Sequence, residues 1–89
     1  RYAQPVFEAE TSDAATARRW GDMLKSQPWS ASIRVEGDTV RVTVSDVALA
    51  RKELLASAMA QDVILRRYEE MRPSLEDVFL QLINREVSQ

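Results

Sequence analysis

Residue types that carry out chemistry in enzymes are scarce in this chain of 89 residues. It contains no Cys and no His, so the thiolate and imidazole groups that often act as nucleophiles, general bases and metal ligands are missing. Two adjacent acid pairs remain, Glu69-Glu70 and Glu76-Asp77. Neighbouring side chains on a helix point about 100° apart and do not converge on one site. We therefore expect no catalytic residue, no metal site and no cofactor-binding residue.

The composition indicates one small globular domain. Hydrophobic residues make up 45% and charged residues 29%, an ordinary globular mixture. The net charge of −2 gives no overall attraction to nucleic acid or anionic membrane, and no apolar run approaches the length needed to span a bilayer. The pairs Arg18-Arg19 and Arg66-Arg67 lack interleaved aromatics, so we expect no nucleic-acid partner. Because the apolar runs are short, we also expect no direct membrane insertion. Because the first residue is Arg1 rather than Met, we expect residues 1–89 to be one domain excised from a longer chain.

The hydrophobic periodicity predicts seven elements in the order β-α-β-β-α-β-α. The strands are expected over 2–10, 31–36, 40–45 and 62–69. The helices are expected from cap candidates at 11–13 to about 26, from 47 to 60, and from 74 onward. This order favours an α+β fold of the ferredoxin-like β-α-β-β-α-β type, with one antiparallel sheet, two helices on one face and an added C-terminal amphipathic helix.

Gly37-Asp38 predicts a two-residue hairpin loop, because Gly supplies the positive φ that primed turns require. The register set by this loop pairs hydrophobic residues on one face: Val35 with Val40, Ile33 with Val42 and Ala31 with Val44.

Inward and outward residues follow from the alternation in the other strands. In the first strand we expect Phe7 and Ala9 to point inward and Glu8 outward. In the last strand we expect Val63 and Leu65 to point inward. The residues expected to point outward are Ile64, Arg66 and Tyr68. Trp20 is predicted to lie in the core. Trp29, which follows Pro28 in a loop, is predicted to cover the edge of the core, with an interface anchor as the alternative.

The hairpin register also places Arg34 directly opposite Arg41 on the polar face of the sheet. Like charges that face each other across strands are destabilising by a fraction of ~1 kcal/mol, so an acid is expected nearby, and Glu8 is the candidate. One hypothesis is that this face docks an acidic patch on a partner through four interaction residues: Arg34, Arg41, Arg66 and Tyr68. The alternative is that both arginines extend into water at little cost.

The segment Pro73-Ser74-Leu75-Glu76-Asp77-Val78-Phe79-Leu80 is the most specific in the chain. Ser74 and Asp77 form a capping box, and an apolar stripe follows at helical spacing: Leu75, Val78, Phe79, Leu82 and Ile83. The sequence of these eight residues resembles the C-terminal motif of ATP-binding subunits of ABC transporters, particularly the ABC-2 type export group. The rest of the chain matches that family in the order of its elements rather than residue by residue.

The resemblance implies a C-terminal accessory domain that follows a nucleotide-binding domain. No Gly-rich loop ending in Lys-Ser or Lys-Thr is present, so ATP and Mg²⁺ are expected to bind the parent protein and not these residues. The implied function is to stabilise subunit contacts that couple ATP hydrolysis to transmembrane transport. The implied partners are the parent nucleotide-binding domain, a second ATPase subunit and the permease, or a second copy as a homodimer. The implied location is the cytoplasm, peripheral to the inner face of the cell membrane.

The alternative is a stand-alone ferredoxin-like module that senses a small ligand or dimerises. Such a module would have a pocket between sheet and helices, or a large interface between two sheets. A nucleic-acid binder on this fold needs exposed aromatics on the sheet, and the predicted open face offers only Tyr68.

Overall fold

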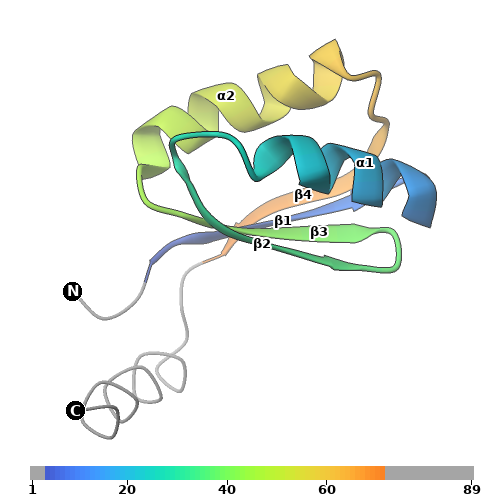
Figure 1. Ribbon diagram of the computed structural model, residues 1–89, viewed down its shortest axis with the longest axis horizontal. Coiled ribbons are helices and arrows are strands. Elements are labelled where there is room, and N and C mark those ends of the chain that lie inside the picture. The colour runs from blue at the N-terminus through green and yellow to red at the C-terminus, as the bar shows by residue number, and fades with distance from the viewer. Residues whose placement is uncertain (1–3, 72–89) are drawn as a thin grey trace, which may run out of the picture.

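Six elements follow one another in the part of the chain that the structure, a computed structural model, describes, namely residues 4–71 (Figure 1). They are β1 (Val6–Thr11), α1 (Ala14–Leu24), β2 (Ser30–Glu36), β3 (Thr39–Val44), α2 (Val47–Ala60) and β4 (Leu65–Met71). This order confirms the predicted succession of the first six elements. The predicted C-terminal helix and the Pro73–Leu80 segment lie outside the described residues.

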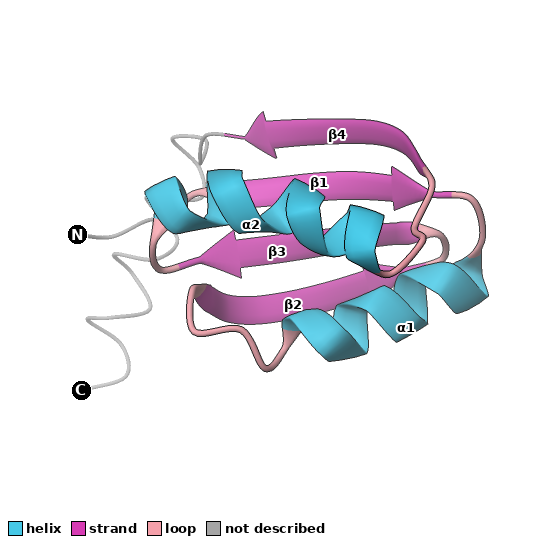
Figure 2. Ribbon diagram, turned by 90° about the horizontal axis from the view of Figure 1, so that it is seen from above, coloured by secondary structure: helices cyan, strands magenta, loops and turns pink. Residues whose placement is uncertain are grey.

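The four strands form one antiparallel sheet in the order β2-β3-β1-β4. Each helix connects two strands that are not neighbours, and both helices lie on the same face of the sheet (Figures 1 and 2). The other face carries no helix of the described part of the chain. The ferredoxin-like α+β fold predicted from the sequence is thereby confirmed.

Aspartates begin both helices. Asp13 caps α1 by accepting a hydrogen bond from the backbone N–H of Thr16 at 2.8 Å, and Asp46 caps α2 through the N–H of Leu49 at 3.1 Å. The bond from Thr16 lowers the pKa of the Asp13 carboxyl, because it stabilises the charged form. Asp13, the last of the three cap candidates at 11–13, is therefore the residue that caps α1.

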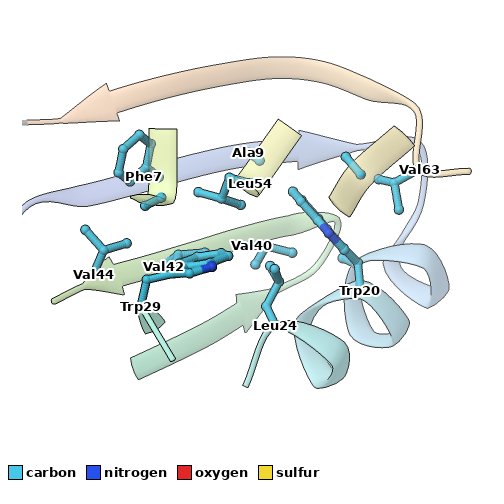
Figure 3. Packing of buried hydrophobic residues seen from close by; sticks show 13 residues of the cluster. Phe7, Ala9, Trp20, Leu24, Trp29, Val40, Val42, Val44, Leu54 and Val63 are labelled. Carbon is cyan, nitrogen blue, oxygen red and sulfur yellow. The ribbon is translucent and has the colours of Figure 1, made fainter. Parts of the chain in front are cut away.

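The core lies between the sheet and the two helices (Figure 3). Phe7 and Ala9 are buried as predicted, and Trp20 lies between α1 and α2, where its Nε1 donates to Oγ of Ser57 at 3.0 Å. Trp29 is only 2% exposed and belongs to the same cluster, so it closes the core and is not an exposed anchor.

The β2–β3 hairpin confirms most of the predicted register. Gly37 has φ 59°, Val35 pairs with Val40 and Ile33 with Val42. The prediction that Ala31 pairs with Val44 is wrong, because the register shifts between Ser30 and Ser32. This bulge places Ser30 opposite Val44 and leaves Ala31 exposed.

A second bulge changes the predicted faces of β4. Glu10 pairs with Arg67 but Thr11 pairs with Leu65, so Arg66 is an extra residue that interrupts the alternation. As a result Tyr68 lies opposite Ala9, on the face covered by the helices, and its ring centroid is 5.9 Å from that of Phe7. The prediction that Tyr68 lies on the open face is wrong. Burial raises the pKa of the Tyr68 phenol, and the nearby Glu70 carboxylate adds to the rise.

The last strand also differs in its limits. β4 begins at Leu65 and runs to Met71, whereas the sequence predicted a strand over 62–69. Val63 is buried as predicted but precedes the strand, in a connection where Asp62 has φ 58°. Ile64 is exposed, as predicted.

Gly21 provides a test of the helix–sheet packing. A Cβ added there would lie 2.7 Å from Cγ2 of Val35, a side chain that is stiff at χ1. We expect Gly21→Ala to lower the free energy of unfolding by about 1 kcal/mol, because an overpacking cost of roughly 1–3 kcal/mol exceeds a helix gain of roughly 0.5–1 kcal/mol. Urea denaturation measures this change.

The control is the same substitution combined with Val35→Ala. Removing Cγ2 relieves the contact, so the double variant should lose less stability than the sum of the two single losses. A Gly21→Ala variant as stable as the parent would contradict the close packing.

Candidate functional site

The sheet face opposite the helices carries mostly polar and charged side chains. The strand pairing arranges them in rows that cross all four strands. The central row consists of Arg34, Arg41, Glu8 and Glu69, and the row beside it of Glu36, Thr39, Glu10 and Arg67. We call these two rows the open charged face.

Glu8 joins two arginines on this face. Its Oε2 lies 3.5 Å from Nη1 of Arg41, and its Oε1 lies 2.7 Å from Nη2 of Arg67. Glu8 was the acid expected to balance the opposed arginines, and the pair with Arg41 confirms that expectation. The bond from Glu8 raises the pKa of the Arg67 guanidinium.

Arg67 was not among the predicted interaction residues. Simple alternation from Leu65 puts Arg67 on the covered face, and only the bulge at Arg66 turns it outward. On the open face Nη1 of Arg67 also lies 2.9 Å from Oε1 of Glu69. No local signal in the sequence marks this bulge, because it depends on pairing with β1.

The other predicted interaction residues are dispersed. Arg34 lies opposite Arg41 as predicted, and its Nε is 3.2 Å from Oε2 of Glu36. Arg66 does not join them, because its Nη1 lies 3.4 Å from Oδ2 of Asp38 in the hairpin loop. Each predicted arginine thus has an acidic partner within the domain. Both signs of charge are therefore present on this face.

The covered face has a further ion pair. Nε and Nη2 of Arg51, on α2, donate to the two carboxylate oxygens of Glu70, on β4, at 2.8 and 2.7 Å. This two-pronged contact raises the pKa of the Arg51 guanidinium. Glu69 and Glu70 therefore point to opposite faces of β4 and do not converge on one site.

One groove of about 330 Å³ lies between α1 and the outer edge of β2. It is lined by Arg18, Asp22, Lys25, Ile33, Val35 and Gly37. Among residues 4–71 no group of three or more acidic side chains is placed to hold a metal ion. In the same range no helix has the length and apolar character to cross a membrane.

Comparison with protein families decides the class of domain. Residues 1–83 match the family described as "ATP-binding protein DrrA1-3-like, C-terminal domain". The chain belongs to this family. It is a C-terminal accessory domain of an ABC ATPase, as the resemblance of Pro73–Leu80 implied. Comparisons with curated proteins and with solved structures found no match.

The family match covers both the described sheet and the motif segment that follows it. The match thus covers residues 1–83 of the 89 given, and it assigns no residue a role. Within the described structure, the open charged face of this accessory domain carries the predicted interaction residues Arg34 and Arg41.

Glu8 offers a test of how far this face is organised within the accessory domain. Glu8→Gln removes the charge shared by Arg41 and Arg67 and leaves Arg41 facing Arg34. We expect the free energy of unfolding to fall by about 1 kcal/mol, the upper range for partly exposed pairs, and the loss to shrink at high salt. Urea denaturation at two salt concentrations measures both effects.

Glu36→Gln is the matched control, because it breaks a single pair whose two side chains are 74% and 69% exposed. Its cost should stay below about 0.5 kcal/mol. Equal losses for the two variants would show that Glu8 does not organise the face.

Proposed function

We propose that this accessory domain is a non-catalytic contact element of its ABC ATPase. It stabilises subunit contacts that couple ATP hydrolysis to transmembrane transport. The family match carries this proposal, because it assigns the chain to the C-terminal part of an ATP-binding protein. Two hydrogen bonds between Arg51 and Glu70 hold α2 to β4.

The open charged face is the proposed contact surface. The two helices cover only one side of the sheet, so the rows through Arg34 and Arg41 remain accessible in the described domain. Arg34 is the residue freest to turn to a partner, because its side chain is 74% exposed and its acid Glu36 is also exposed. The partner is the parent nucleotide-binding domain or the second ATPase subunit.

The remaining assignments follow from the family. The parent protein binds ATP and Mg²⁺, and the permease of the same transporter brings the domain to the inner face of the cell membrane. The accessory domain then lies in the cytoplasm and reaches the membrane only through the complex.

The groove beside α1 supports a second candidate, a module that senses a small ligand. Its volume of about 330 Å³ is at the lower end of the range for ligand pockets. Three of its lining side chains are charged, and Asp22 already pairs with Lys25 at 3.4 Å. The groove lies at the sheet edge and not between the sheet and both helices, so it supports ligand sensing less than the family match supports a contact element.

The isolated domain should neither bind nor hydrolyse ATP. Isothermal titration with Mg-ATP should give no saturable heat, and a phosphate-release assay should give no turnover above buffer. The intact ATP-binding subunit is the positive control. Turnover that remains with the purified domain after a second purification step would contradict the proposal.

Arg34→Glu tests the contact surface in the intact subunit. A coupling of about 1–3 kcal/mol corresponds to roughly 5–150-fold in an equilibrium constant, so we expect at least a fivefold loss in ATP-dependent dimerisation. Analytical ultracentrifugation with Mg-ATP measures dimerisation, and the ATPase rate is followed in parallel.

Lys25→Glu is the control, because Lys25 is also an exposed residue in a surface ion pair but lies at the end of α1, away from the open charged face. It should leave dimerisation unchanged. Equal dimerisation of the Arg34→Glu variant and the parent would argue against this face as the contact.

A further inference from the structure

The outer side of α2 is unusually apolar. The exposed positions of α1 include Arg18, Arg19 and Asp22, as expected for a helix with one face in water. On α2, by contrast, Met59 is 80% exposed and Leu55 41% exposed. Three exposed alanines accompany them: Ala48, Ala56 and Ala60.

Leu55 and Met59 lie toward the β4 side of α2. Arg51 contacts Glu70 of β4, whereas Ser57 contacts Trp20 of α1, so these two positions mark opposite flanks of the helix. Leu55 follows Arg51 by four residues, and Met59 follows Leu55 by four. Residues four apart form a ridge along one side of a helix, so this ridge continues from the β4 flank toward solvent.

No described helix covers β4. Figure 2 shows α2 above the middle of the sheet and α1 beside β2, while β4 forms the opposite edge with no described helix above it. On that strand Leu65 and Tyr68 face the helix layer and are only partly buried. We call the surface formed by Ala48, Leu55, Met59, Leu65 and Tyr68 the α2–β4 shelf.

We propose that the chain's own segment 75–83 docks on the α2–β4 shelf. This segment lies outside the described residues, and its sequence predicts a helix with one apolar stripe. The stripe consists of Leu75, Val78, Phe79, Leu82 and Ile83. Burying it against the shelf would remove both apolar surfaces from water at once.

The end of β4 lies in the right place for this docking. Met71 pairs with Val6, and Val6 pairs on its other side with Thr43, close to the end of β3 that leads into α2. The chain therefore leaves the sheet beside the start of α2. A helix that turned back there would run along β4 in the direction of α2. Ala48 to Met59 spans about 17 Å and Leu75 to Ile83 about 12 Å, so the stripe fits the shelf.

Charge favours the same arrangement. Lys52 is exposed on α2 and has no ion pair within residues 4–71. Glu76 and Asp77 stand in the first turn predicted for the docked segment. In the parallel arrangement these acids come level with the first half of α2, where Lys52 lies. The docking goes beyond the proposed function and does not depend on it.

A disulfide pair tests the docking in the intact ATP-binding subunit. Residues 1–89 contain no cysteine, so Leu55→Cys and Leu82→Cys introduce the only thiols of this domain. Mild oxidation should join them within one chain, as read by peptide mass spectrometry and by a monomer band on a non-reducing gel. Glu69→Cys with Leu82→Cys is the control, because Glu69 lies on the opposite face of β4; it should cross-link at least fivefold less.

A charge reversal provides the second measurement. Lys52→Glu should lower the yield of the disulfide between positions 55 and 82 several-fold, and Arg18→Glu on the exposed side of α1 should not. The proposal is overturned if the control pair joins as readily as the test pair or if the disulfide links two copies. It is equally overturned if the thiol introduced at position 82 is recovered unmodified, or joined to the nucleotide-binding domain, while circular dichroism shows the domain folded.

Discussion

The burial of two tryptophans in a core of small residues is the constraint on which the domain depends. Trp20 and Trp29 are the largest fully buried side chains, and around them the core is built largely from alanine and valine. Short side chains let the helices approach the sheet, and the indole rings then fill the remaining volume. Trp20 also needs a partner for its indole N–H, and Ser57 provides it from the other helix. The position of each helix is therefore tied to that of the other.

This core is one-sided, and the chemistry of the second sheet face follows from that. A face without a helix layer must remain compatible with water, so charged and polar residues occupy most of its outward positions. Glu8 distributes its charge between Arg41 and Arg67, which keeps three arginines on the face without an uncompensated cluster. The result is a surface with a fixed pattern of both charges. Such a pattern contributes more to the choice and orientation of a partner than to affinity.

Local rules in the sequence were enough for much of the fold. Strict alternation and Gly37-Asp38 determined the hairpin, and capping aspartates marked the helix starts. What alternation could not reveal are the two bulges. The extra residue Arg66 appears only where β4 pairs with the end of β1, and it moves Tyr68 and Arg67 to the faces opposite to those predicted by alternation. The family, in contrast, was recognisable from the residue sequence of Pro73–Leu80, without reference to any contact in the structure.

The bulge between Ser30 and Ser32 has a consequence for the domain when it is separated from the rest of its protein. β2 is an edge strand, and an edge with unpaired N–H and C=O groups can recruit strands from other molecules. An irregular edge with exposed Arg34 and Glu36 is a poor template for such growth. The bulge between Ser30 and Ser32, which a register read from the sequence alone does not show, therefore protects the β2 edge of the sheet from aggregation.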